Sequence, residues 1–181
     1  MNNNEFFQNQ LEFGEEAERI VNDYLISQGY FTLPLYQFRR VETELTGTPS
    51  FKYISKYGFT KEIPSPDIIV CGKGENFFCE VKRKQSWVDK KYSGRLETGL
   101  DRPRLEEYFK LMENSNMDLH IYFVQEEQEP IGIYRIIITN ENRNEVMESV
   151  REKPQYVRKS HNYIKTEWMA FFGIKNLEKI K

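Results

Sequence analysis

The stretch that decides the fold runs from Pro66 to Lys82 and reads PDIIVCGKGENFFCEVK. Two short runs of β-branched, aromatic and other apolar residues flank the segment GKGEN, which carries two glycines and an asparagine. Such runs separated by a short glycine-containing connection are typical of a β-hairpin. We therefore expect one strand at 67–71 and a second at 77–82, joined by a turn at 72–76.

Three charged residues lie within this hairpin. Side chains alternate between the two faces of a strand, so Glu80 and Lys82 share a face, and antiparallel pairing brings Asp67 beside them. Apolar residues occupy both faces of each strand, which is typical of a sheet covered on both sides. Charges in such a setting are costly unless they pair or bind a cation. An aspartate at a strand entry and a Glu-x-Lys triplet are each common by chance; their conjunction indicates a site.

Two neighbouring carboxylates repel one another unless a cation lies between them. Mg²⁺ meets this requirement because it takes oxygen ligands and keeps several waters. Lys82, two residues beyond Glu80, would then hold or polarise a bound water. The hairpin therefore predicts a metal site built on Asp67 and Glu80.

The rest of the chain alternates helical and extended patterns. Apolar residues spaced as on one face of a helix predict helices at 10–28, which Gly29 would end, and at 102–114. A further short helix is a candidate at 140–150, and the role of the aromatic residues in 164–172 is left open. Residues 83–100 show little periodicity and predict a loop, whereas 51–59 fit either a strand or an excursion from the core. The remaining expected extended segments are 30–41, 119–125 and 131–139.

Length and composition favour one α/β domain. The chain has 181 residues, of which 39% are hydrophobic, and a formal net charge of −2. We expect a single domain over 1–181, with 42–65 as an insertion before the motif and 140–181 as a C-terminal extension. Two cysteines form no metal-type spacing, and no apolar run is long enough for a bilayer. With no signal-peptide pattern at the start, these features predict a soluble cytoplasmic protein that does not bind membranes.

Charge is unevenly distributed along the sequence. Residues 1–50 hold eight acids and three bases, whereas 82–95 hold six bases and one acid. The tail from 151 to 181 holds eight bases and three acids, and is either a phosphate-facing surface or a solvated edge. A basic segment that leaves the strand of the predicted metal site fits a phosphate backbone. The predicted DNA contacts are Arg83, Lys84, Lys90, Lys91 and Arg95. Trp87 and Tyr92 would either stack on bases or pack onto the body.

The pattern Pro66-Asp67…Glu80-Val81-Lys82 resembles the signature of the PD-(D/E)XK nuclease superfamily. The resemblance implies a restriction-endonuclease-like core of a helix, a three-stranded meander, a helix and a strand, in which helices flank a mixed central sheet. The segment GEEAER at 14–19 is similar to the first helix of the archaeal Holliday-junction-resolvase-like branch. In that branch a glutamate at the position of Glu18 faces the metal.

The same resemblance implies the catalytic set Lys82, Glu80, Asp67 and Glu18. Asp67, Glu80, the Val81 carbonyl and Glu18 would bind Mg²⁺, with Mn²⁺ as a substitute, and Lys82 would position the attacking water. A solvated role in the acidic first turn is the alternative for Glu18, with Glu15 as the fallback ligand. The implied function is metal-dependent hydrolysis of DNA phosphodiester bonds, including branched or processed DNA.

Several alternatives stay open at this point. Many relatives place a glutamine on the second core helix, but the comparable stretch here reads RLEEY, from Arg104 to Tyr108, and Gln85 is a weaker candidate. His120 and His161 lack a nearby motif, so we expect structural or incidental roles for them. The chain could also be an inactive nuclease-fold protein that binds DNA or supports a complex, or an unrelated α/β binding module. A homodimer is plausible from the resemblance; RNA as substrate and endo- against exonuclease action stay undecided.

Overall fold

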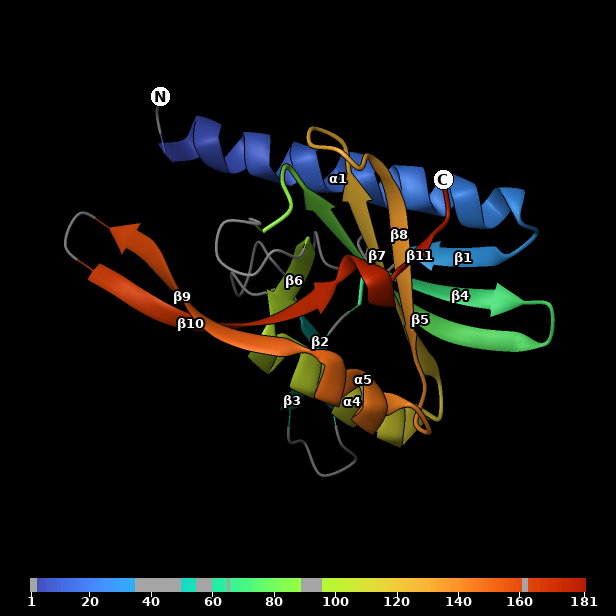
Figure 1. Ribbon diagram of the computed structural model, residues 1–181. Helices are drawn as coiled ribbons and strands as arrows, with labels where there is room; N and C mark the ends of the chain where they lie inside the picture. The colour runs from blue at the N-terminus through green and yellow to red at the C-terminus, as the bar shows by residue number, and fades with distance from the viewer. Residues whose placement is uncertain (1–2, 35–49, 55–59, 65, 89–95, 161–162) are drawn as a thin grey trace.

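The computed structural model describes residues 3–34, 50–54, 60–64, 66–88, 96–160 and 163–181, and the side chains of 14–34, 66–88, 96–154 and 168–181. A six-stranded mixed sheet lies at the centre, in the order β1-β4-β5-β7-β8-β11. One long helix covers one face, and two shorter helices with a second sheet cover the other (Figure 1). The helices are α1 (Asn3–Ser27), α4 (Arg102–Ser115), α5 (Arg143–Ser149) and the 3₁₀ turn η1 (Ile174–Asn176).

The strands form three separate sheets. A three-stranded sheet has the order β6-β10-β9, and β2 pairs with β3 in a two-stranded sheet. In chain order the strands are β1 (Phe31–Pro34), β2 (Ser50–Ile54), β3 (Thr60–Pro64), β4 (Ile68–Gly72), β5 (Glu75–Lys84), β6 (Glu97–Asp101), β7 (Asp118–Gln125), β8 (Gly132–Ile138), β9 (Arg151–Ser160), β10 (Tyr163–Gly173) and β11 (Glu178–Lys179).

The centre of the main sheet is the predicted hairpin. β4 pairs antiparallel with β5, with Ile68 opposite Cys79, and β1 extends the pair into a three-stranded meander. β7 then lies parallel to β5, with Glu80 opposite Ile121. Because a parallel neighbour needs a long crossover, the chain passes through β6 and α4 between these two strands. The order of helix, meander, helix and strand is the one expected from the sequence.

Helix α1 packs on the sheet through one apolar stripe. Ala17, Val21 and Leu25 are buried at four-residue spacing and contact a core formed by the Ile68–Val70 side of β4 and the Cys79–Val81 side of β5. The helix ends at Ser27, and Gly29 adopts a φ of 85°, as expected for the glycine that follows a helix. It begins at Asn3, earlier than the predicted residue 10. The helix length thus exceeds what the apolar periodicity alone indicated.

Helix α4 packs on the opposite face of the sheet. Pro103 lies in its first turn, and Leu105, Tyr108 and Met112 are buried against Ile121 and other residues of β7. This second core also contains residues contributed by β6, β8 and β10. The α4 face of the sheet carries residues 78, 80 and 82 of β5, so this helix covers the face on which the sequence places Glu80.

The predicted loop at 83–100 is wrong in two described parts. β5 continues to Lys84, and Glu97–Asp101 forms β6, which pairs with β10. The side chains of β6 do not alternate between buried and exposed, because its first four residues are all buried. The sequence therefore carries no period-two signal for this strand. A Cβ on Gly99 would lie 2.2 Å from the Ala170 carbonyl oxygen, so the pairing requires glycine there. Residues 89–95 lie outside the described part of the chain.

The C-terminal region completes both sheets. The stretch 164–172, whose role was left open, falls in β10, where Ala170 and Phe172 enter the α4-side core. β11 pairs with β8 at the edge of the main sheet. The β2–β3 hairpin, within the predicted insertion 42–65, lies beside α4. Within the described residues, no helix is long and apolar enough to cross a membrane.

The two tryptophans of the chain offer a matched test of this packing. Trp87 is 3% exposed and meets the Tyr134 ring edge-on, whereas Trp168 is 51% exposed. We expect Trp87→Ala to lower the free energy of unfolding by about 3–5 kcal/mol, because a buried aromatic leaves a cavity. Trp168→Ala should change it by about 0.5 kcal/mol or less. Urea denaturation followed by circular dichroism measures both; equal losses would contradict the assigned core.

Candidate active site

The predicted charged residues come together on the α4 face of the hairpin. The Asp67 amide donates to the Cys79 carbonyl at 3.0 Å, which extends the β4–β5 ladder by one residue and sets Asp67 across from Glu80. Asp67 is 5% exposed and Glu80 is 2% exposed. Two carboxylates thus lie next to one another at the start of β4, inside a largely apolar sheet.

Both oxygens of the Glu80 carboxylate have protein partners. Lys82 Nζ forms an ion pair with Oε1, and the Tyr108 hydroxyl donates to Oε2 at 2.6 Å. Lys82 comes from the same strand and Tyr108 from α4. The carboxylate is therefore held between a cation and a phenol, which offsets the cost of burying its charge.

Asp67 is fixed by the backbone of the opposite strand. Its Oδ2 accepts a hydrogen bond from the Val81 amide at 2.7 Å. The Asp67 carboxylate thus reaches across to the residue between Glu80 and Lys82. This contact positions Asp67, Glu80 and the Val81 backbone as one cluster.

Lys82 remains charged in this setting. Burial lowers its pKa, but the charges of Glu80 and Asp67 outweigh burial and raise the pKa above its ordinary value. The Lys82 side chain is 34% exposed, so its ammonium group reaches the surface while it is paired with Glu80. Lys84, two residues on, differs: burial, followed by the charge of Lys82, lowers its pKa to about 8.

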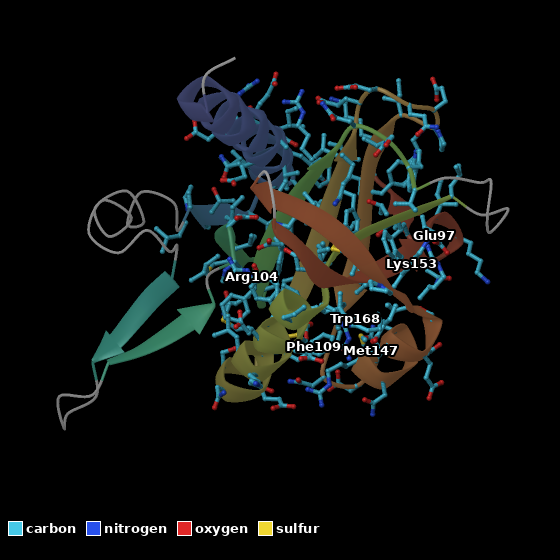
Figure 2. The ribbon with its side chains drawn as sticks, turned by 90° about the vertical axis from the view of Figure 1, so that its left-hand side faces the viewer. Glu97, Arg104, Phe109, Met147, Lys153 and Trp168 are labelled. Carbon is cyan, nitrogen blue, oxygen red and sulfur yellow. The ribbon has the colours of Figure 1, made fainter. Side chains whose placement is uncertain are left out.

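Arg104 and Tyr108 are site residues that the sequence reasoning missed in this role. They are one turn apart on α4, and the Arg104 guanidinium lies 5.6 Å from the centre of the Tyr108 ring. Burial opposes the charge of Arg104, but Tyr108 and Glu80 favour it and raise its pKa. Burial, and then Glu80, raise the pKa of Tyr108 well above its ordinary value, so its hydroxyl keeps the donated proton. Figure 2 shows where Arg104 lies on the molecule. The signal was their four-residue spacing within RLEEY.

Glu18 lies on α1, the helix that covers the face of the sheet opposite Glu80. The pKa of the buried Cys79 thiol is raised, first by burial and then by the carboxylates of Asp67, Glu80 and Glu18. Cys79 lies on the α1 side of β5, whereas Glu80 lies on the α4 side, so a role for Glu18 as a metal ligand stays a prediction. Glu15, the fallback, is exposed on the same helix.

The predicted DNA contacts fall into two groups. Arg83 pairs with Glu16 of α1 at 2.7 Å and with Glu126, so its guanidinium links the helix to the end of β7, and its predicted DNA contact stays a prediction. Lys84 is half-buried on β5. Lys90, Lys91, Arg95 and the aromatic Tyr92 lie outside the described residues. Trp87 packs on the body, where its ring nitrogen donates to the Pro130 carbonyl.

A buried glutamine lies on the same face as the charged residues. Gln125 is 1% exposed and stands opposite Lys84 in the β5–β7 register, two residues beyond Phe123, which stands opposite Lys82. Neither side-chain atom of Gln125 has a hydrogen-bond partner among the described residues. Gln85, the glutamine considered from the sequence, is exposed in the bend after β5. Gln125 is thus the glutamine that the fold brings to this end of the sheet.

The donor set suits a hard cation in its chemistry. Within the described residues, no group of three or more His, Cys, Asp and Glu side chains has metal-binding geometry. Mg²⁺, however, is commonly held by one or two carboxylates together with waters and substrate oxygens. Asp67 and Glu80 supply two buried carboxylates beside one backbone segment, so the residues present fit such a cation.

Comparisons with known proteins support the architecture. No family model and no curated protein matches this chain. Among solved structures, it is similar to Hjc, a Holliday junction resolvase from the archaeal hyperthermophile Archaeoglobus fulgidus, with a TM-score of 0.51 and 11% identity over 92% of this chain and 91% of that one. The chain has a restriction-endonuclease-like fold. At this identity the likeness concerns the fold alone.

His120 has a structural position on the other side of the sheet. Its ring stacks on Phe77 with centroids 3.7 Å apart, and it is 5% exposed. Burial, aided by Arg135, lowers its pKa from 6.5 to about 3. The folded chain therefore keeps this imidazole neutral over a range in which the unfolded chain protonates it.

This difference predicts a pH dependence of stability. Between pH 6.5 and 3 the unfolded state binds one more proton at His120, so the contribution is intact above pH 6.5 and is lost as the pH falls. Near pH 5, His120→Phe should reduce the pH slope of the unfolding free energy by about 1.4 kcal/mol per pH unit. Urea titrations from pH 5 to 7.5 measure the slope. Loss of the slope in His161→Gln instead would contradict the assignment.

Proposed function

We propose that this protein is a metal-dependent nuclease that hydrolyses phosphodiester bonds in DNA. The observation that carries the proposal is the pair of buried carboxylates, Asp67 and Glu80, with the partly exposed Lys82 on one face of the β4–β5 hairpin. A protein rarely buries two carboxylates side by side without a chemical use or a compensating partner. The restriction-endonuclease-like fold supports the same interpretation.

Asp67, Glu80 and the Val81 carbonyl would hold Mg²⁺ or Mn²⁺, with Glu18 as a further ligand or a neighbouring acid. When bound, the cation would lower the pKa of water and neutralise charge on the scissile phosphate. Both strand carboxylates are fixed before any cation arrives, since the Val81 amide holds Asp67 and the side chains of Lys82 and Tyr108 hold Glu80. Such preorganisation reduces the cost of assembling the site during the reaction.

Lys82 would orient the attacking water and stabilise charge that develops on the phosphate. Its ammonium is anchored on Glu80 and still partly exposed, so it can donate to a substrate oxygen without leaving the site. Because its pKa is raised, it acts as a cation and hydrogen-bond donor rather than as a base at neutral pH. The proton released by water must therefore go to another acceptor or to solvent.

The α4 pair would complete the site. Tyr108 holds Glu80 in one orientation through its hydroxyl, which makes it a positioning residue. Arg104 carries a positive charge near Glu80 and Asp67 and makes a 3.7 Å ion pair with the exposed Glu107. A guanidinium at this place suits a phosphate oxygen, because it offers several donors in a fixed plane.

Branched or processed DNA is the substrate class we favour. Hjc, a solved structure with a similar fold, is named as a Holliday junction resolvase. The basic residues near β5 fit a phosphate backbone in general and carry no preference for one DNA form. Cleavage assays on DNAs of different form therefore decide among junctions, flaps and ends.

A second candidate is an inactive DNA-binding or structural protein with the same fold. The observation in its favour is that Lys82 and Tyr108 engage both oxygens of Glu80. With Arg104 nearby, this arrangement balances the charges of Glu80 and Asp67 without a cation. The two candidates differ in whether the protein cleaves bound DNA when divalent cations are present.

A substrate panel tests the proposal. We expect the protein to cleave at least one of supercoiled plasmid, linear duplex, four-way junction and single-stranded DNA with Mg²⁺ or Mn²⁺, but not with EDTA. Lys82→Ala should lower the rate by about 10²-fold or more, because it removes a donor to the developing charge. Lys179→Ala, an exposed lysine of β11, is the matched control and should retain wild-type activity.

Two results would count against the enzyme. Wild type and Lys82→Ala that are equally inert on every DNA, with both folded by circular dichroism, favour the inactive candidate. Cleavage that persists unchanged in EDTA would contradict the metal requirement instead. Gel-shift binding on the same DNAs shows whether an inert protein still binds.

Tyr108→Phe isolates the positioning of Glu80. It removes only the hydroxyl, so kcat should fall about 10–100-fold and the Mg²⁺ concentration for half-maximal activity should rise, while KM for DNA stays unchanged. Tyr134→Phe is the control, since its hydroxyl also donates within the protein, to the Pro130 carbonyl at 3.1 Å. Equal effects of the two variants would assign Tyr108 a purely structural role.

A further inference from the structure

The β9–β10 ribbon leaves the body of the molecule. Strands of 10 and 11 residues form it, but β10 pairs with β6 only from Met169 to Gly173. From Trp168 towards the tip, the described register gives β10 only β9 as a partner. Figure 1 shows this part, in orange and red, extending away from the six-stranded sheet and beyond β6. At about 3.3 Å per residue, the extension is roughly 20 Å long.

The ribbon concentrates positive charge in an otherwise acidic chain. Residues 153–168 hold four Lys or Arg and one Glu, whereas the whole chain holds 26 Lys or Arg and 28 Asp or Glu. The four bases are Lys153, Arg158, Lys159 and Lys165. An isolated two-stranded ribbon is marginal in water and gains nothing from like charges, so this composition needs another explanation.

The root of the ribbon is fixed to the helix that lines the candidate site. Arg151 donates to the buried Glu97 and lies 4.8 Å from the centre of the Phe171 ring. Glu152 accepts from Arg102 at 2.6 Å, and Arg102 begins α4. β6 runs directly into α4, so ribbon, helix and site form one continuous framework. The ribbon therefore has a defined direction relative to Glu80.

Lys153 and Trp168 mark the point where the ribbon departs. Both are exposed, and they lie one register step apart, because Trp168 pairs with Pro154 and Met169 with Lys153. Figure 2 shows Lys153 beside Glu97, and Trp168 near Phe109 and Met147. Lys153 thus lies at the root of the ribbon, and the sequence places Arg158, Lys159 and Lys165 on the strands beyond it.

We propose that the β9–β10 ribbon is an arm that binds duplex DNA outside the reactive phosphate. The major groove, about 12 Å wide, admits a two-stranded β-ribbon, and lysine and arginine side chains on such a ribbon can reach the flanking phosphates. This inference rests on the proposed function, because it takes DNA as the partner of the ribbon. It adds a binding surface distinct from the carboxylate cluster and from 82–95.

The test compares two triple variants that remove the same charge. Arg158→Gln/Lys159→Gln/Lys165→Gln changes the ribbon, and Lys175→Gln/Lys179→Gln/Lys181→Gln changes the exposed lysines near the C-terminus. Both are made in a Lys82→Ala background, and binding to a 30-base-pair duplex is measured in EDTA over a salt series. The ribbon variant should bind about tenfold or more weakly at 0.1 M salt, and its salt slope should fall by about one for each phosphate that the ribbon no longer neutralises. The C-terminal variant should match its parent.

Three outcomes would overturn the arm. One is equal weakening in both variants, which would reflect total charge alone. Another is unchanged binding in the ribbon variant. The third is a dimer that becomes a monomer in sedimentation when the ribbon is changed, which would assign the ribbon to contacts between two copies.

The arm and the nuclease proposal can fail separately. If the wild type cleaves no DNA but the ribbon variant selectively loses duplex binding, the arm stands and the enzyme does not. If the wild type cleaves and the ribbon variant binds DNA as its parent does, the arm alone is wrong. A further comparison uses two four-way DNA junctions, one with 30-base-pair duplex branches and one with 8-base-pair branches. Removing the ribbon charges should weaken binding only to the junction with the long branches.

Discussion

The carboxylate of Glu80, buried between Lys82 and Tyr108, is the interaction on which the rest of the structure depends. Its burial would cost several kcal/mol without these partners. Lys82 is supplied by the same strand, whereas Tyr108 must be brought from α4, so the helix has to lie on this face of the sheet in one rotation. The same rotation buries Leu105 and Met112. Packing of the helix and geometry of the site are thus a single constraint.

The hairpin and its charged face could be predicted because they are local. Alternation over a few residues and a glycine-rich turn specify which side chains share a face, and the structure keeps that assignment: Ile68 and Val70 pack towards α1, while Phe78 belongs to the α4-side core. The first helix follows in the same way from Ala17, Val21 and Leu25. Such patterns can be interpreted within one helix or strand, so predicting the element needs no knowledge of distant contacts.

The elements that escaped prediction are those whose stability comes from distant partners. β6 has four consecutive buried residues and no alternation, and its Glu97 is neutralised by Arg151, which is 54 residues away in the sequence. Arg83 looked like a phosphate contact because its neighbours are basic, yet its partners are Glu16 and Glu126. The four-residue spacing of Tyr108 and Arg104 puts them on one helix face, but only the fold shows that this face meets Glu80. Local charge does not reveal which acids tertiary structure will bring to a base.

This distinction also bears on how a chain with a net charge of −2 can meet DNA. Arg83 is neutralised by carboxylates of α1 and of the end of β7, so the body uses part of its positive charge to hold itself together. The ribbon carries one acid between residues 153 and 168, and its root is held by the pairs Arg151–Glu97 and Arg102–Glu152. Under the proposal, charges on the ribbon would keep their electrostatic range towards an approaching phosphate, whereas the charge of Arg83 is screened by its own partners. The ribbon is therefore where a modest number of lysines and arginines has the largest effect on binding.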